Sequence, residues 1–197
     1  MPVCARDTGT YLGFMAVLIV FVVLARYRNG KLPDKAIIIV AAFGLALYAF
    51  DGFSSYLGFR STTNDLRLIS GLAFGSGISM LLLSAASNLL FRNGTDHSLR
   101  TFTYRDLPMV YLITAILAVP LLIEGGMLFY YLESTIVIAG LLLMVFLVML
   151  IFVVILTGWG FEKDGGRWRS IAAACVLESA VLIVLWLAHH FGSVTLL

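Results

Sequence analysis

The chain alternates between long apolar runs and short polar segments. A helical run of about 20 apolar residues matches the thickness of the hydrocarbon core of a bilayer. Glu133-Ser134-Thr135 is expected to form a tight connection between the fourth and fifth runs. The pattern predicts an all-α, polytopic transmembrane bundle of about six helices, with residues 1–197 forming a single integral membrane domain. The predicted spans cover about residues 10–26, 36–51, 68–91, 108–131, 135–159 and 170–190.

The composition supports a membrane protein. Of the 197 residues, 61% are hydrophobic and 12% are charged, and the mean hydropathy is +1.02. Soluble domains are about 45–50% apolar and about 25% charged, so a water-soluble core cannot absorb this excess. The net charge of +2 is too small to indicate nucleic acid as a partner. We therefore expect a multi-pass protein of the cell membrane whose main partner is the lipid bilayer.

The basic residues of the loops predict the orientation. Cytoplasmic loops of membrane proteins carry an excess of Lys and Arg. The loops after the first, third and fifth spans hold ten such residues, whereas the opposite side holds three. With six spans, both termini are then expected on the extracytoplasmic side. The ten are Arg26, Arg28, Lys31, Lys35, Arg92, Arg100, Arg105, Lys163, Arg167 and Arg169, and the three are Arg6, Arg60 and Arg67.

Polar residues from distant parts of the chain converge on the predicted outer leaflet. A charge at the centre of a transmembrane helix costs about 2.5–3.5 kcal/mol on insertion scales, so such residues suggest function. Arginine binds phosphate or carboxylate through a planar fork of two donors. We therefore expect an anion site for a lipid or headgroup. Its ligand-binding candidates are Arg6, Arg60, Asn64 and Arg67, and its candidates for a catalytic base or metal contact are Asp51 and Glu124.

A simpler interpretation of the same segment remains open. Asp51 could pair with Arg60 or Arg67 and only tie the loop to the bundle. A metal site is a weaker hypothesis, built from Cys4, Asp7 and His189. The two cysteines of the chain, Cys4 and Cys175, are too far apart in sequence to indicate a disulfide framework. The sequence identifies no cofactor.

Small residues recur four positions apart in the first and third spans. Gly9 and Gly13 lie in the first, and Gly71, Gly75 and Ser79 in the third. Small residues at this spacing allow helices to approach closely in lipid. We interpret them as packing positions of the bundle.

Two segments resemble a known family. The segment Cys4-Ala5-Arg6-Asp7-Thr8-Gly9-Thr10-Tyr11-Leu12-Gly13 resembles the C-A-R-C-T-G-x-Y-x-G signature of a prokaryotic membrane-protein family whose domain has no known function. Residues 51–71 are similar to the same family's D-G-x-x-Q-x-x-G-x-R-x-S-x-N-x-L-R-x-x-T-G stretch. The resemblance covers about a third of the chain and supplies no reaction. The matching positions of the second segment are Asp51, Gly52, Gly58, Arg60, Asn64, Leu66, Arg67 and Gly71.

Departures from the family pattern bear on function. Asp7 stands where the family has its second cysteine, and Ser55 stands near the family's glutamine. A Cys-x-x-Cys pair could serve redox or metal chemistry, and this chain lacks it. The departure favours an alternative in which the protein is a non-catalytic subunit or scaffold among membrane-protein partners. A small transporter is a second alternative, although the charges thin out toward the cytoplasmic half.

Overall fold

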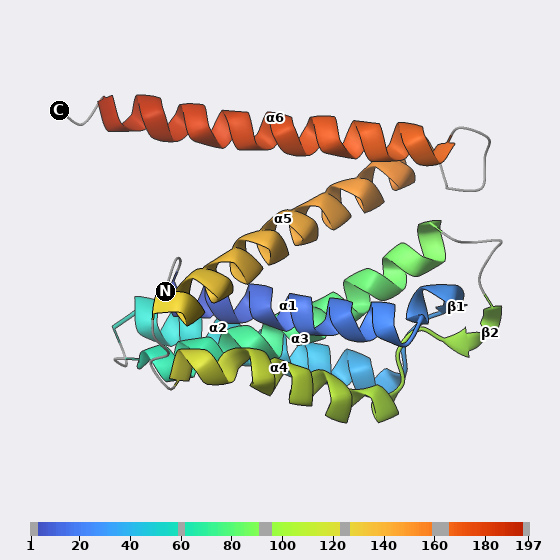
Figure 1. The fold of residues 1–197 in the computed structure, drawn as a ribbon, viewed down its shortest axis with the longest axis horizontal. Helices are drawn as coiled ribbons and strands as arrows, with labels where there is room; N and C mark the ends of the chain where they lie inside the picture. Colours follow the sequence, from blue (N-terminus) through green and yellow to red (C-terminus); the bar gives the residue numbers. More distant parts are fainter. Residues whose placement is uncertain (1–3, 59–61, 91–95, 123–126, 159–165, 195–197) are drawn as a thin grey trace.

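The computed structural model describes residues 4–58, 62–90, 96–122, 127–158 and 166–194. Six α-helices account for most of this part of the chain, so the predicted all-α polytopic bundle is confirmed (Figure 1). The helices are α1 (Ala5–Val23), α2 (Lys35–Tyr56), α3 (Asn64–Leu90), α4 (Leu107–Leu122), α5 (Met127–Thr157) and α6 (Gly166–Val194). The short elements are η1 (Arg26–Arg28), β1 (Asn29–Lys31), β2 (Asp96–Arg100) and η2 (Tyr104–Asp106).

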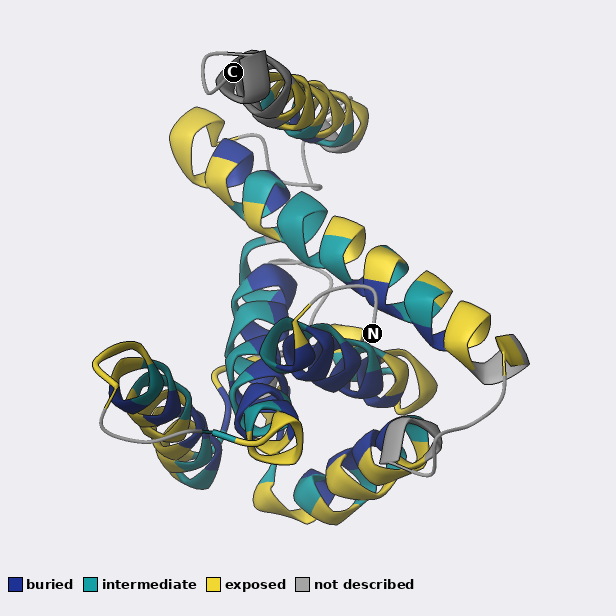
Figure 2. Cartoon of the chain, turned by 90° about the vertical axis from the view of Figure 1, so that its left-hand side faces the viewer, coloured by how far each residue is buried: buried dark blue, intermediate teal, exposed yellow. Residues whose placement is uncertain are grey.

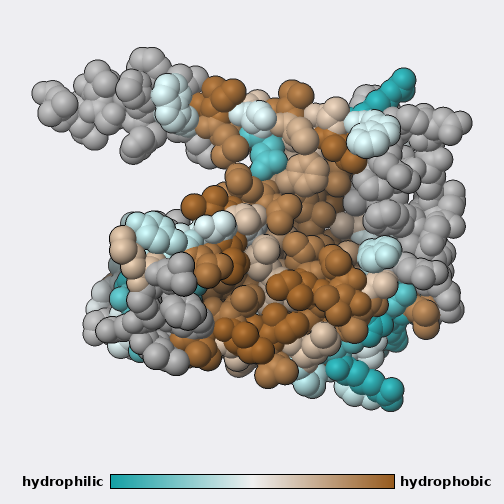
Figure 3. Space-filling model, in the orientation of Figure 1, coloured by the Kyte–Doolittle hydropathy of each residue, from teal (hydrophilic) through white to brown (hydrophobic). Residues whose placement is uncertain are grey.

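Four helices of the described chain are long and apolar enough to cross a membrane. They are α1, α2, α3 over Asn64–Leu89 and α5 over Tyr130–Thr157. The described part of α4 has 16 residues and is shorter than these. Figure 3 shows hydrophobic side chains over the middle of one face, with hydrophilic ones gathered toward the ends of the helices. This distribution fits a bundle surrounded by lipid.

The connection expected at Glu133-Ser134-Thr135 is not found, because these residues lie inside α5. The hydroxyl of Ser134 donates to the carbonyl of Tyr130 at 2.7 Å, and that of Thr135 donates to the carbonyl of Tyr131 at 2.8 Å. Each hydroxyl is thus satisfied by the helix itself, four residues back, and does not interrupt it. Instead α4 ends at Leu122, and α5 begins at Met127.

Helix α3 forms the centre of the bundle and packs closely on α1. A Cβ atom on Gly13 would lie 2.8 Å from the backbone nitrogen of Ser76. Cβ atoms on Gly71 and Gly75 would overlap the backbone carbonyl oxygens of Arg6 and Thr10. The small residues therefore do act as packing positions, since the two backbones touch where they face each other. In Figure 2 the buried residues concentrate on these helices.

Polar contacts join the loops at the end where α1 finishes, which we call the Arg26 end. Strand β1 pairs in parallel with β2, and the Thr101 hydroxyl lies 2.9 Å from the carbonyl oxygens of both Asn29 and Lys31. The Arg26 guanidinium forms an ion pair with Asp106 at 2.5 Å. This network fixes the loop after α1 against the loop before α4.

Helix α6 stands apart from the other helices. It packs on α5 through a small cluster that includes Val154 and Ala174, and the rest of the helix lies apart from α1 to α4 (Figures 1 and 2). The beginning of α1 and the end of α6 lie on the same side of the molecule, at the left in Figure 1. We call this side the Arg6 end.

Candidate functional site

At the Arg6 end, a charged pair joins two helices that are far apart in sequence. The Arg6 guanidinium, in the first turn of α1, donates from Nη2 and Nε to Oδ2 of Asp51 in α2, at 2.6 and 3.2 Å. The Ser70 hydroxyl of α3 lies 3.3 Å from the same oxygen. The Asp51 side chain is only 4% exposed and that of Arg6 19% exposed. One carboxylate therefore links α1, α2 and α3.

Two aromatic rings pack beside this charged pair. The Arg6 guanidinium carbon lies 5.4 Å from the ring centroid of Tyr48, one turn before Gly52 in α2. The Tyr48 ring in turn packs on Phe74 of α3, with 4.6 Å between centroids. A guanidinium over an aromatic face is attracted to the ring and loses little freedom. The orientation of Arg6 is therefore fixed by both its carboxylate and its ring.

The second arginine of the site uses hydroxyl groups as partners. Arg67, in the first turns of α3, donates from Nε to the Thr62 hydroxyl at 2.7 Å and from Nη2 to the Ser55 hydroxyl at 3.2 Å. The Thr62 hydroxyl also lies 3.3 Å from that of Ser55. The pairing of Asp51 with Arg67 considered from the sequence is not found among the described residues, where Asp51 forms its ion pair with Arg6. Arg67 therefore forms no ion pair with a carboxylate of the described residues, and its side-chain partners are neutral hydroxyl groups.

The two arginines line one open cavity of about 370 Å³, which we call the arginine cavity. Gly52 lies beside Nη1 of Arg6, since a Cβ atom at this position would be 3.4 Å from that donor, close to van der Waals contact. Nη1 is the Arg6 nitrogen that does not contact Asp51. The cavity thus offers donors from two guanidinium groups to an anion. Its lining residues are Cys4, Arg6, Gly52, Ser55, Tyr56 and Arg67.

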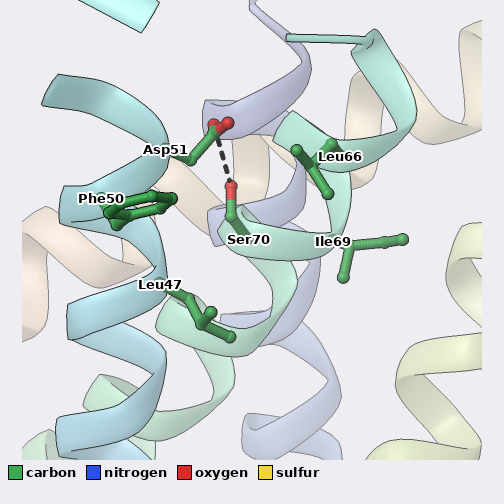
Figure 4. Close-up of a pocket in the computed structure, with 6 residues that line it drawn as sticks. All are labelled: Leu47, Phe50, Asp51, Leu66, Ile69 and Ser70. Carbon is green, nitrogen blue, oxygen red and sulfur yellow. Dashed lines mark hydrogen bonds between the residues drawn. The ribbon is translucent and has the colours of Figure 1, made fainter. Parts of the chain in front are cut away.

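A smaller cavity of about 240 Å³ lies between α2 and α3. Its walls are the apolar side chains of Leu47, Phe50, Leu66 and Ile69, as Figure 4 shows. Asp51 and Ser70 face each other at one end of it, joined by their hydrogen bond. The charged pair is thus flanked by an apolar cavity as well as a polar one.

The remaining candidates from the sequence have separate positions. Asn64 begins α3 and is exposed. Cys4 is exposed at the start of α1, with Asp7 in the first turn after it. Within the described part of the chain, no three His, Cys, Asp or Glu side chains come together. Arg60, Glu124 and the side chain of His189 lie outside the described residues.

Several residues of the site were not singled out from the sequence. Ser70 contacts Asp51 and Tyr48 contacts Arg6, yet their residue types are common in membrane helices and carry no pattern. Ser55 was noted only as a departure from the family pattern, and the structure shows it as a partner of Arg67. Glu133 was assigned to a connection, but it lies in α5 and is 7% exposed. Its Oε1 accepts no hydrogen bond from the described residues. The signal that could have found it is a carboxylate within an apolar run.

The fold and the site define the class of protein. Apolar spans packed through glycines, with charged groups gathered at their ends, are the features of an integral membrane protein with several α-helical spans. The chain belongs to the family described as "Predicted membrane protein (DUF2085)", whose profile matches residues 1–81. That match contains α1, α2 and most of α3, and so includes both arginines of the cavity.

Two archaeal relatives support this assignment. An uncharacterized protein of Methanothermobacter thermautotrophicus is 33% identical over 81 residues, which are 41% of this chain and 68% of the relative. The uncharacterized protein MJ1492 of Methanocaldococcus jannaschii is 28% identical over 92 residues, which are 47% of this chain and 57% of the relative. The chain thus spans little more than half the length of the latter. No solved structure matches the chain.

Proposed function

We propose that the protein binds the phosphate-bearing headgroup of an anionic lipid in the arginine cavity. The observation that carries the proposal is the placement of Arg6 and Arg67 on the same cavity. Arginine forks match the geometry of phosphate oxygens, and charge-assisted hydrogen bonds are about twice as strong as neutral ones. Arg67 is the stronger contributor, because Arg6 already shares its charge with Asp51.

A lipid explains the surroundings of the cavity better than a soluble anion does. The cavity lies where three helices begin or end, which is the depth of the headgroups if these helices span the bilayer. The end of α2 beside it exposes Phe53, Tyr56 and Leu57, three apolar or amphipathic side chains that acyl chains can contact. A headgroup in the cavity would therefore keep its chains in the hydrocarbon.

The site is proposed for binding rather than for catalysis. Asp51, the candidate base, accepts hydrogen bonds from Arg6 and is 4% exposed, so its carboxylate is engaged in holding the helices together. A base must reach the proton that it abstracts, within about 3.2 Å. Asn64 and Arg60 remain proposed ligand-binding residues.

The test is lipid binding by the purified protein in an uncharged detergent. Dioctanoyl phosphatidylglycerol is expected to bind, and Arg67→Gln is expected to weaken it about tenfold or more, since a hydrogen bond to a charged group contributes about 1.5–3 kcal/mol. Arg105→Gln is the matched control, because this exposed arginine lies in η2 at the Arg26 end. Unchanged binding by the Arg67 variant would contradict the proposal. Equal binding of dioctanoyl phosphatidylcholine, or full competition by inorganic phosphate, would exclude anionic-lipid recognition.

We also propose that the Arg6 end faces the outside of the cell membrane. The support is the excess of Lys and Arg in the loops of the opposite end. Cys4 is exposed and offers a natural reporter in a Cys175→Ser background. A membrane-impermeant maleimide should label Cys4 in intact cells, whereas Lys31→Cys, in a chain without the natural cysteines, should be labelled only after permeabilisation. The reverse pattern would show the opposite orientation.

A structural subunit of a larger membrane complex is the second candidate function. The observation that favours it is the mutual engagement of Arg6 and Asp51, which gives part of the family-like segment a purely structural use. Purification in a mild detergent should then recover partner proteins in fixed proportion. A single species without partners would count against this candidate and leave the lipid proposal standing.

A further inference from the structure

A second cavity lies on the other side of Arg6, where α5 crosses the bundle. It has a volume of about 390 Å³, and we call it the Asp7 groove. Asp7, Thr10 and Tyr11 of α1 line it, together with Tyr48 and Phe74 of α2 and α3. The opposite wall is a methionine- and valine-rich stretch of α5 between Met144 and Met149. The groove is thus apolar along α5 and carries a carboxylate on α1.

The carboxylate of Asp7 has no partner within the described chain. It forms no hydrogen bond or ion pair there, whereas Arg6, its neighbour in sequence, is engaged with Asp51. The charge of Arg6 is therefore already compensated by Asp51. A carboxylate beside a largely apolar groove interacts strongly with an opposite charge, because the local dielectric is low and little water competes. This position favours a cation.

The walls of the groove favour a cation with an apolar body. The Tyr48 ring contacts Arg6 and Phe74, so its orientation is fixed, and the Tyr11 ring lies on the same side of the groove as Asp7. Methionine side chains adapt to ligands of irregular shape. A small metal ion would leave most of this volume unfilled and would find a single carboxylate. An organic cation would fill the groove and neutralise Asp7.

We infer that the Asp7 groove binds an amphiphilic organic monocation, with its charge beside Asp7 and its apolar body between α1 and α5. The site is distinct from the arginine cavity in both charge and lining, with Arg6 and Tyr48 standing between the two. It does not depend on the lipid proposal. A ligand of opposite charge and equal shape should be rejected.

The test compares two probes of nearly the same shape. Tetraphenylphosphonium and tetraphenylborate each carry four phenyl groups, but their charges are opposite. Calorimetric titration of the purified protein in an uncharged detergent should show saturable, one-site binding of the phosphonium and no comparable site for the borate. Asp7→Asn should weaken phosphonium binding at least about tenfold, since it removes the charge at the same side-chain volume.

Matched variants distinguish binding in the Asp7 groove from nonspecific effects of charge or folding on phosphonium binding. Asp65→Asn removes an exposed carboxylate from the first turn of α3, at the same end of the molecule, and should leave phosphonium binding unchanged. Val148→Trp should block the groove without altering charge, and Asp7→Glu should retain most of the affinity. Arg67→Gln should affect lipid binding alone. Equal phosphonium binding by the Asp7→Asn variant, confirmed as folded by its thermal unfolding, would overturn the inference, as would equal binding of the borate.

Discussion

The Arg6 guanidinium places two of its nitrogens, Nε and Nη2, on a single oxygen of Asp51, 45 residues away in the chain. This contact joins the first turn of α1 to the last two turns of α2, and Ser70 adds α3 to the same oxygen. Both charges lie beside a close backbone contact of α1 and α3, that of Gly71 with Arg6. The pair therefore sets the position of three helices at once.

Breaking this pair from one side should destabilise the protein strongly. Asp51→Asn leaves the largely buried Arg6 without its counter-charge, and the expected loss in the free energy of unfolding is about 3 kcal/mol. The double variant Arg6→Met/Asp51→Leu should lose less than the sum of its two single variants, because no charge is left unpaired. Unfolding in mixed micelles of increasing SDS fraction measures these values. Asp65→Asn is the control, with an expected change within about 0.5 kcal/mol; a similar loss there would refute the assignment.

The sequence singled out Arg6, Asp51 and Arg67, which meet at the Arg6 end, but it did not predict how they pair. Arg6, Asp51 and Arg67 were all candidates, since charges near apolar spans are conspicuous. Their partners depend on how α1, α2 and α3 pack. Glycines bring α1 against α3, and in that arrangement Arg6 of α1 lies within hydrogen-bond distance of Asp51 of α2. The hydroxyl of Ser55 contacts Arg67 across 12 positions of the chain. No local sequence pattern encodes that contact, so the sequence alone did not predict it.

The close contact of α1 and α3 predicts how a Gly→Ala substitution there changes the free energy of unfolding. In an exposed helix Gly→Ala is stabilising by about 1 kcal/mol. Gly75→Ala should have the opposite sign and destabilise by about 1–3 kcal/mol, because the new Cβ atom would overlap the carbonyl oxygen of Thr10. Gly52→Ala is the matched control, since its Cβ atom would meet only the Arg6 guanidinium, at 3.4 Å, which is close to an ordinary van der Waals contact. Thermal unfolding in detergent should therefore rank the control at or above the wild type and the Gly75 variant below it.

Helix boundaries were the least predictable part of the fold. The expected connection at Glu133-Ser134-Thr135 rested on three polar residues in a row, which usually interrupt an apolar span. In α5 the two hydroxyls bond to carbonyls one turn earlier, so polar residues continue the helix. Similarly, α1 begins at Ala5, before the apolar run expected from residue 10. The first turn contains the charged residue Arg6, which is accommodated there because it pairs with Asp51 of α2. Periodicity does not distinguish these cases.

The polar network at the Arg26 end should contribute to stability independently of the Arg6 pair. Asp106 accepts hydrogen bonds from Arg26 Nη2 at 2.5 Å and from the backbone N–H of Thr103 at 2.8 Å, and it is buried. Asp106→Ala removes the counter-charge and the capping acceptor together, so a loss of about 3 kcal/mol is expected in SDS titration. Arg105→Ala, its exposed neighbour, is the control and should change little. Because the two ends share no partner, the losses from Asp106→Ala and Asp51→Asn should add.

The turn after α1 offers a substitution that should stabilise the protein. Ala25 follows the last turn of α1 with φ at +48°, in the left-handed region. A residue with a Cβ atom pays roughly 1–2 kcal/mol there, whereas glycine adopts this conformation without steric cost. Ala25→Gly should therefore raise the free energy of unfolding by about 1 kcal/mol, because the greater freedom of glycine in the unfolded chain offsets part of the relief. Ala42→Gly is the matched control: this exposed residue lies inside α2, where the same replacement should destabilise by about 1 kcal/mol. Opposite signs in the two variants are expected, and a loss of stability in both would show that Ala25 is not strained.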